Sequence, residues 1–211
     1  LCKISPFQYF AILMKPVGMH RLNLFFFLLV ANVLSSHAQD FRWQQRVEYT
    51  MDVKLDVNTH KLTGTQKLTY YNHFRDTLTK AYYHLYWNAF QPGSMMDVRS
   101  MNITDPDPRV GSRISQLKDD EIGYHRVVNL KQDGKDVSHH VDGTVMEVIL
   151  SKRLLPGSKT VFDMKFEAQV PIQIRRSGRN SKEGISYSMT QWYPKMAEYD
   201  HQGWHAYQYV A

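Results

Sequence analysis

Alternating apolar and polar positions recur along the chain and predict antiparallel strands. Residues 47–57 alternate over eleven positions, with apolar side chains at Val47, Tyr49, Met51, Val53, Leu55 and Val57. A half-buried strand requires this period of two, because successive side chains point to opposite faces. Asn58-Thr59-His60 predicts a turn, and residues 61–71, which are rich in Thr and Tyr, predict the second strand of a hairpin.

A second long alternation lies nearer the end of the chain. One face of residues 160–170 carries Thr160, Phe162, Met164, Phe166, Ala168 and Val170. Shorter runs predict further strands at 81–88, 124–131, 144–150 and 184–191. Turn signals separate these runs, and Asp133-Gly134 is strong because Asp-Gly favours a tight hairpin turn.

The segments between these strands predict little helix. Residues 94–101 predict one helical turn and 112–119 a short helix, whereas 102–111 predict a loop and 175–183 a polar, mobile loop. About seven short strands, with no helix long enough for a β-α-β unit, predict an all-β fold. We expect a saddle-like antiparallel β-sandwich.

The first 38 residues differ from the rest because they contain no Asp or Glu. From Met19 the chain reads His20-Arg21, then the apolar run 22–34, then Ser35-Ser36-His37-Ala38. A short basic segment, an apolar run and small residues before a cleavage point predict a signal peptide over 19–38. An uncleaved membrane anchor is the alternative, although the run is shorter than the roughly 20 residues that a membrane span needs.

This interpretation divides the chain into three parts. Residues 1–18 are expected to be a mis-assigned extension upstream of the true start, 19–38 the signal peptide and 39–211 the folded domain. The domain would then be exported, periplasmic or secreted, and would meet a membrane only during export. We also expect it to be truncated at its C-terminal end, because Ala211 comes after an aromatic run with no sign of a natural terminus.

Charge and cysteine content narrow the chemistry open to residues 39–211. Three of the 26 basic residues lie in the first 38 residues, so the formal net charge falls from +6 to +3 without them. The remaining Lys and Arg are scattered, and we expect no nucleic-acid partner. The only cysteine is Cys2, which excludes disulfides, cysteine nucleophiles and cysteine-ligated metals from the domain.

His201 and His205 have the spacing of a zinc-binding helix, in which two imidazoles share one face. Gln202 stands where that motif needs a general base, and an amide cannot accept the proton. Gly203 disfavours a helix as well. We therefore interpret this segment as a loop.

Three other histidines have ordinary structural interpretations. His139 and His140 point to opposite faces of a strand, so they cannot share an ion with Asp142 without a bend. We interpret them as the polar flank of a hairpin. His84 lies in the aromatic run 81–88 and is expected to be packed and hydrogen-bonded.

One segment resembles a known family. Residues 184–200 read GISYSMTQWYPKMAEYD, in which Thr190-Gln191 leads to Tyr193-Pro194 and then to Asp200. This resembles the end of the N-terminal domain of the aminopeptidase N family of zinc metallopeptidases, the gluzincin aminopeptidases and leukotriene hydrolase relatives. It is similar to a bacterial branch, and it departs from the commoner branch, which has a longer spacing before the aromatic-Pro pair. The stretches KLTGTQKLTYYNH (61–73) and LLPGSKTVFDMKFEAQVP (154–171) resemble an early strand and a late hairpin of that domain.

The resemblance spans roughly residues 43–211 and implies a saddle-shaped β domain that packs on its own catalytic domain. The family's zinc site, HExxH with a later Glu, and its GxMxN motif lie in that catalytic domain, and neither occurs in these 211 residues. The resemblance thus implies a peptide substrate and a zinc cofactor for the longer protein. It implies no catalytic or metal residue in this chain, which alone would be inactive.

The resemblance also implies one substrate-binding residue, Gln191, which would line the pocket for the substrate's first residue. An amide carbonyl suits this task because it can accept a hydrogen bond from a peptide α-ammonium. The alternative is that Gln191 satisfies a strand edge.

Two other functions remain open from the sequence. A non-catalytic exported β-sandwich could bind a carbohydrate or a protein partner, with a stacking platform made of Tyr82, Tyr83, Tyr86 and Trp87. The alternation of Tyr83, Leu85 and Trp87 is instead typical of a core face. An accessory domain that has lost its enzyme differs from the peptidase domain only in the sequence beyond residue 211.

Overall fold

The computed structural model describes residues 44–104 and 110–210. The predicted extension (1–18) and signal peptide (19–38) lie outside the described residues, as does part of the loop predicted at 102–111. Within the described ranges, no helix is both long and apolar enough to cross a membrane.

Two antiparallel sheets form the body of the domain. The larger sheet has the order β1-β2-β8-β4-β5. It contains β1 (Arg46–Asp56), β2 (Lys61–Tyr71), β8 (Lys159–Gln169), β4 (Tyr124–Gln132) and β5 (Lys135–Asp136).

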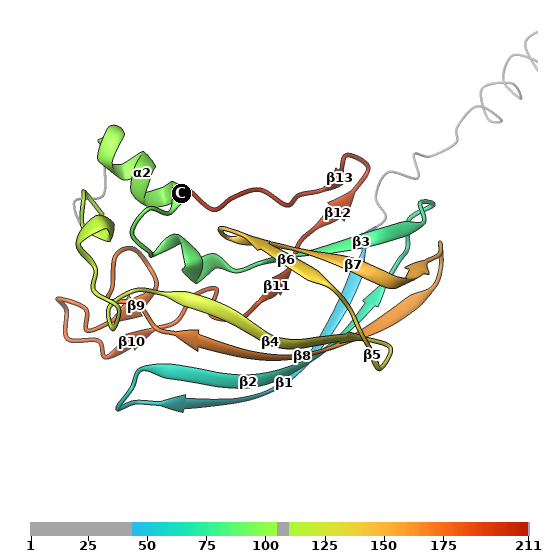
Figure 1. Ribbon diagram of the computed structural model, residues 1–211, viewed down its shortest axis with the longest axis horizontal. Helices are drawn as coiled ribbons and strands as arrows, with labels where there is room; N and C mark the ends of the chain where they lie inside the picture. Colours follow the sequence, from blue (N-terminus) through green and yellow to red (C-terminus); the bar gives the residue numbers. More distant parts are fainter. Residues whose placement is uncertain (1–43, 105–109, 211) are drawn as a thin grey trace, which may run out of the picture. The chain divides into compact units, whose positions relative to one another are not determined.

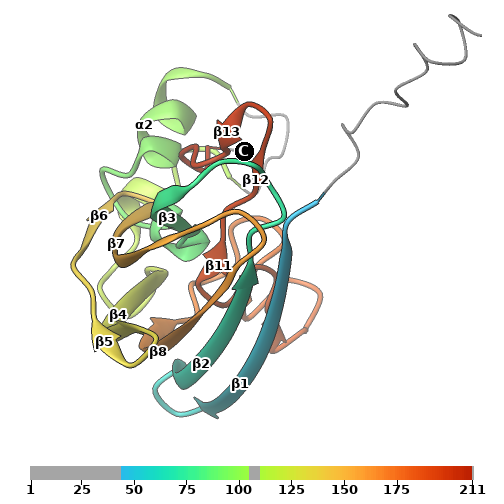
Figure 2. The same ribbon diagram turned by 90° about the vertical axis from the view of Figure 1, so that its right-hand side faces the viewer.

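The second sheet has the order β11-β3-β7-β6. It contains β11 (Lys195–Met196), β3 (Leu78–His84), β7 (Val145–Leu154) and β6 (His139–Asp142). Figure 1 and Figure 2 show β1, β2, β8 and β4 in one layer and β3, β7 and β6 in the other. The all-β antiparallel sandwich predicted from the alternation is confirmed.

The long strands pair without interruption where the alternation is regular. The β1–β2 hairpin runs in register from Arg46 opposite Tyr71 to Asp56 opposite Lys61. The β2–β8 ladder is equally continuous. A slip of one residue would turn every inward apolar side chain towards solvent, so burial of one face fixes this register.

Two clusters of buried side chains make the core. The cluster between the sheets includes Leu68, Tyr70, Tyr83, Leu85, Met146, Val148, Phe162, Met164 and Phe166. The cluster at one end of the sandwich includes Leu62, Trp87, Phe90, Met96, Ile114, Ala168, Val170 and Ile174. Burial of each large apolar side chain contributes roughly 1.5–3 kcal/mol, so both clusters stabilise the domain.

Short helices close the end of the sandwich near the second cluster (Figure 1). They are the 3-10 helices η2 (Tyr86–Ala89) and η3 (Ile114–Gln116) and the α-helix α2 (Met95–Asn102). The Ser94 side chain accepts a hydrogen bond from the backbone N–H of Asp97 at 3.1 Å, which satisfies a helix-terminal donor. The helical turn predicted at 94–101 is present as the longer, eight-residue helix α2, and the helix predicted at 112–119 is a single 3-10 turn.

The predictions of strands at 81–88 and 184–191 are wrong in extent. The first strand ends at His84 and continues as η2, because the chain turns there to bury Trp87 in the second cluster. The second is reduced to β10 (Tyr187–Ser188), which pairs with β9 (Gly178–Arg179). Ile185, Tyr187 and Met189 do alternate with polar residues, but Ile185 is exposed, so burial of one face does not extend this strand.

The prediction that residues 175–183 form a mobile polar loop is wrong at its centre. Ser177, Gly178 and Arg179 are buried. A Cβ atom on Gly178 would lie 2.3 Å from Gln173 Cα, and its φ of +145° is one that side chains rarely adopt, so only glycine fits. The Arg179 guanidinium donates to the carbonyls of Val170 and Asp120 at 3.3 and 2.6 Å.

Candidate functional site

Gln191, the predicted substrate-binding residue, lies in a turn between β10 and β11 and not on a strand edge. Its side chain is exposed, and its backbone has a left-handed φ of +54°. The described non-glycine residues with positive φ are His60, Asp133, Asn180 and Gln191. Asn, Asp and His are enriched in this conformation, whereas Gln is not.

Buried donors hold the carbonyls on both sides of Gln191. The Trp87 indole N–H donates to Ser177 Oγ at 2.9 Å and to the Thr190 carbonyl at 3.2 Å. The His125 Nε2 atom lies 2.9 Å from the Trp192 carbonyl oxygen. The Trp87 and His125 rings are stacked, with centroids 5.1 Å apart and planes inclined by 16°. Buried side chains therefore fix the backbone on both sides of the exposed Gln191.

The neutral form of His125 suits this arrangement. Burial lowers the pKa of His125 to about 4. Its Nδ1 atom accepts a 3.4 Å hydrogen bond from the Trp87 backbone N–H, which leaves Nε2 as the protonated nitrogen that donates to Trp192. Each ring nitrogen thus has a partner in the form that predominates at neutral pH.

Side chains continue this support towards β11. The buried Gln66 amide donates to the Pro194 carbonyl at 2.9 Å. The backbone N–H of Met196 donates to the Tyr49 hydroxyl at 2.9 Å. Alternate carbonyls of the 190–194 segment, at Thr190, Trp192 and Pro194, are therefore each bound by a side chain from a distant part of the sequence.

Sequence reasoning did not find the supporting roles of Trp87, His125, Ser177 and Gln66. Gln66 carried a signal, because it is the polar member of an otherwise apolar face of β2. A polar side chain at an inward position needs a buried partner. For Gln66 that partner lies 128 residues away in the sequence.

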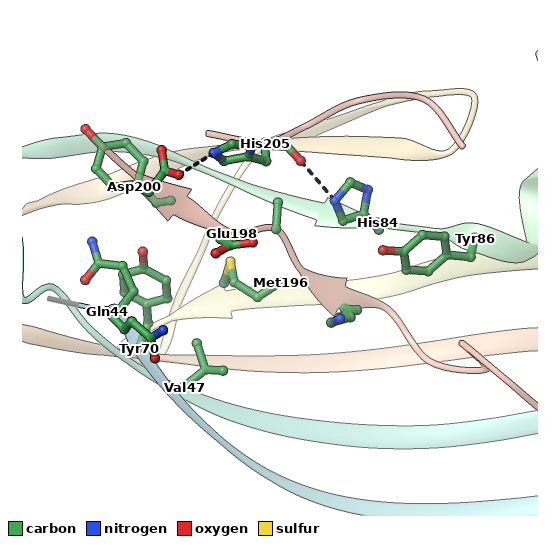
Figure 3. A pocket seen from close by; sticks show the side chains of 13 residues that line it. Gln44, Val47, Tyr70, His84, Tyr86, Met196, Glu198, Asp200 and His205 are labelled. Atoms are coloured by element: carbon green, nitrogen blue, oxygen red, sulfur yellow. Dashed lines mark hydrogen bonds and ion pairs between the residues drawn. The ribbon is translucent and has the colours of Figure 1, made fainter. Parts of the chain in front are cut away.

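A separate cleft of about 400 Å³ opens beside the second sheet. Figure 3 shows His84 and Tyr86 at one side and Gln44, Val47 and Tyr70 at the other, with Glu198 between them. The described residues that line it include no Ser, Cys or Thr that could act as a nucleophile.

The polar pair in this cleft stabilises a hairpin. His205 Nε2 lies 2.8 Å from Asp200 Oδ2, and this hydrogen bond lowers the pKa of the Asp200 carboxyl. Asp200 also accepts from the backbone N–H of Gln202 at 2.7 Å. These contacts close the turn between β12 (Tyr199–Asp200) and β13 (Gly203–Trp204). The interpretation of 201–205 as non-helical is confirmed.

The other histidine predictions are also resolved. The exposed residues His139 and His140 lie on β6, as expected for a polar hairpin flank. His84 Nε2 lies 3.1 Å from the His205 carbonyl oxygen and the ring stacks on Tyr86, which confirms a packed, hydrogen-bonded histidine. Burial lowers the pKa of His84.

The described residues do not form a metal site or a complete aromatic platform. No group of three His, Cys, Asp or Glu side chains in 44–104 and 110–210 is arranged to hold a metal ion. Tyr83 and Trp87 are fully buried, so two of the four aromatic residues proposed for sugar stacking are inaccessible. The core interpretation of Tyr83, Leu85 and Trp87 is confirmed.

One apolar surface stands out beside the second cluster. Met95, Val98 and Met101 occupy positions i, i+3 and i+6 of α2 and are 57%, 48% and 52% exposed. Residues with this spacing lie along one side of a helix. The helix therefore buries Met96 and Ser100 against the domain and presents a methionine-rich stripe to the outside.

Comparisons with known proteins give only structural neighbours, because no family model and no curated protein matches the sequence. The M1 zinc metallopeptidase from Deinococcus radiodurans matches 73% of this chain and 29% of its own, with 16% identity and a TM-score of 0.44. A two-domain M1 zinc metallopeptidase mutant bound to L-arginine matches 72% and 29%, with 16% identity and a TM-score of 0.44. A Deinococcus radiodurans M1 mutant bound to a Tyr-Ser-Ala substrate matches 70% and 27%, with 16% identity and a TM-score of 0.42. The chain thus spans less than a third of the length of these structures.

Proposed function

We propose that this chain is the N-terminal β domain of an exported zinc-dependent aminopeptidase of the aminopeptidase N family, bacterial branch. The observation that carries the proposal is the placement of Gln191. It is exposed, and its strained backbone is held on both sides, within the segment whose motif resembles that family. Strained, over-determined residues cluster at ligand-binding sites.

In this proposal the domain supplies a pocket wall and not the chemistry. The side-chain amide carbonyl of Gln191 would accept a hydrogen bond from the α-ammonium of a peptide substrate. Hydrogen bonds to charged groups contribute roughly 1.5–3 kcal/mol. Zinc would be bound by a catalytic domain of the longer protein, because the described residues offer no set of ligands that fits the ion.

The exposed apolar stripe on α2 supports the proposal that this face of the domain packs on another domain. Apolar side chains exposed together mark interaction surfaces. In our proposal Met95, Val98 and Met101 pack on the protein's own catalytic domain. An isolated 39–211 chain would then associate at high concentration, and replacement of these three residues by Ser would keep it monomeric in sedimentation experiments.

Export belongs to the same proposal. The basic, apolar and small-residue pattern of 19–38 would direct the chain to the periplasm or the medium and be removed after Ala38. N-terminal sequencing of the mature protein would then begin at Gln39.

The activity is tested with the purified full-length protein and an aminoacyl p-nitroanilide. We expect hydrolysis that a zinc chelator abolishes and added zinc restores, and no hydrolysis of the N-acetylated substrate. The isolated 39–211 chain serves as control and should contain no stoichiometric zinc by elemental analysis. A full-length protein that is folded and zinc-loaded but inactive on a panel of aminoacyl substrates would contradict the proposal.

A further inference from the structure

We propose that Trp87 and His125 are positioning residues, which hold the Gln191 turn in the conformation that receives the substrate's N-terminus. This inference rests on the proposed function and adds to it the part of the fold that makes the pocket wall rigid. Neither side chain is exposed enough to touch a substrate, because Trp87 is 0% and His125 is 4% exposed.

The Trp87 and His125 donors act on the two sides of Gln191. They bind the carbonyls of the residues immediately before and after Gln191, which are Thr190 and Trp192. Gln191 itself is left exposed between these two fixed points. Its backbone orientation is thereby determined by side chains from η2 and β4, not by a strand partner.

The Gln191 backbone is strained. A left-handed backbone is unfavourable for a residue with a Cβ atom, and Gln lacks the short polar side chain that offsets this cost in Asp133 and Asn180. Such a conformation persists only where surrounding contacts impose it. The contacts that surround Gln191 include the Trp87 and His125 hydrogen bonds.

The two donor side chains are themselves held in place. The indole and imidazole rings stack on each other, and His125 is tied to η2 by its backbone N–H, which donates to Asn88 Oδ1 at 2.7 Å. Ser177 Oγ adds a third anchor 3.0 Å from the Thr190 carbonyl oxygen. A binding residue ordered in advance loses less entropy when a ligand arrives.

The test is a double-mutant cycle in the full-length enzyme, with KM and kcat measured for an aminoacyl p-nitroanilide. Gln191→Ala should raise KM about tenfold with little change in kcat, since it removes a hydrogen bond to a charged group made in both ground and transition states. His125→Leu should raise KM roughly threefold to fivefold through misplacement of Gln191.

The double variant distinguishes a role of His125 through Gln191 from an independent effect on KM. If His125 acts through Gln191, His125→Leu adds no further rise in KM in the Gln191→Ala background. His125→Gln, which keeps a side-chain N–H near the Trp192 carbonyl, should recover most of the wild-type KM. The matched control is His84→Leu, a half-buried histidine that binds a carbonyl elsewhere, and it should leave KM unchanged.

Ser177→Ala provides a second variant if His125→Leu does not fold, since it removes only the hydroxyl that bridges Trp87 and Thr190. It should raise KM about twofold, again only when Gln191 is present. Additive effects of either variant with Gln191→Ala would overturn the positioning role while leaving the aminopeptidase proposal intact. A wild-type enzyme without zinc-dependent activity would overturn both.

Discussion

The β1–β2 hairpin and the 190–194 segment satisfy their backbone hydrogen bonds by different means. Each strand of the hairpin pairs with its neighbour over eleven residues in one unbroken register. The 190–194 segment has no ladder among the described strands, and its alternate carbonyls are bound by Trp87, His125 and Gln66.

This difference separates what a backbone ladder can do from what side-chain donors can do. A ladder imposes extended geometry along the whole strand, because alternate residues must direct their N–H and C=O groups to the partner strand. Individual side-chain donors fix single carbonyls and leave the residue between them free to adopt another conformation. Gln191 uses that freedom for its left-handed backbone.

The largest expected effect lies in the body of the sandwich. Phe162 is buried between the sheets and meets Tyr83 edge to face, with ring centroids 6.2 Å apart. Phe162→Ala should cost about 3–5 kcal/mol in the free energy of unfolding, because the cavity cannot close fully. Urea unfolding of the 39–211 chain at low concentration measures it. A cost below about 1 kcal/mol would mean that packing between the two sheets contributes little to the free energy of unfolding.

The next largest effect is a pH dependence of the unfolding free energy, which His125 beside the Gln191 turn causes. The folded pKa of His125, about 4, lies below its ordinary 6.5, so the unfolded chain takes up the proton first as the pH falls. The stability contributed by neutral His125 is complete above pH 6.5 and is lost between 6.5 and 4, by about 3 kcal/mol.

His125→Gln should flatten this part of the pH profile, because glutamine does not titrate. The difference between wild type and variant isolates His125 from His60 and His84, whose pKa values burial also lowers. Unfolding free energies measured at several pH values between 4 and 7 give the comparison. Parallel profiles for the two proteins would show that His125 is not buried in the folded state.

A smaller effect is expected for the donor at the end of the 190–194 segment. Gln66→Met keeps the volume but leaves the Pro194 carbonyl without its 2.9 Å donor. An unsatisfied buried acceptor costs about 1–3 kcal/mol. The exposed neighbour Lys67→Met should change stability by less than about 0.5 kcal/mol. Equal changes in unfolding free energy for Gln66→Met and Lys67→Met would show that the Gln66 hydrogen bond does not support the 190–194 segment.

The smallest effect is expected at Gln191 itself. Gln191→Gly relieves the left-handed strain but adds entropy to the unfolded chain, so the unfolding free energy should change by less than about 1 kcal/mol. The same variant should weaken substrate binding in the full-length enzyme, because the amide is lost. A large loss of stability would show instead that the Gln191 side chain supports the fold.

The sequence predicted the regular half of the molecule well, for a physical reason. Along most of β1, β2 and β8 exposed positions alternate with half-buried or buried ones, so the local pattern predicts these strands. The helix α2 begins at a local cap, in which Ser94 accepts a hydrogen bond from the backbone N–H of Asp97, so its start depends on neighbouring residues.

The same reasoning failed where partners are distant. The buried loop at 177–179 depends on Arg179 reaching the Asp120 carbonyl, and the Gln191 turn depends on Trp87 and His125. These contacts join residues separated by 59 to 103 positions, and no local pattern encodes them. His125 itself offered a trace, because it is a polar side chain within a segment predicted to be a strand, and it is buried with Leu130 and Gln132 of β4.

The most direct measurement for the central claim is the sequence of the coding DNA beyond the codon for Ala211. The account predicts that it encodes GxMxN and HExxH with a further Glu downstream, on a domain that packs against this β domain. Gln191, Trp87 and His125 would then be the residues to mutate. A stop codon directly after Ala211, or a downstream region without HExxH, would contradict the aminopeptidase proposal and turn attention to the exposed stripe on α2 as a binding surface.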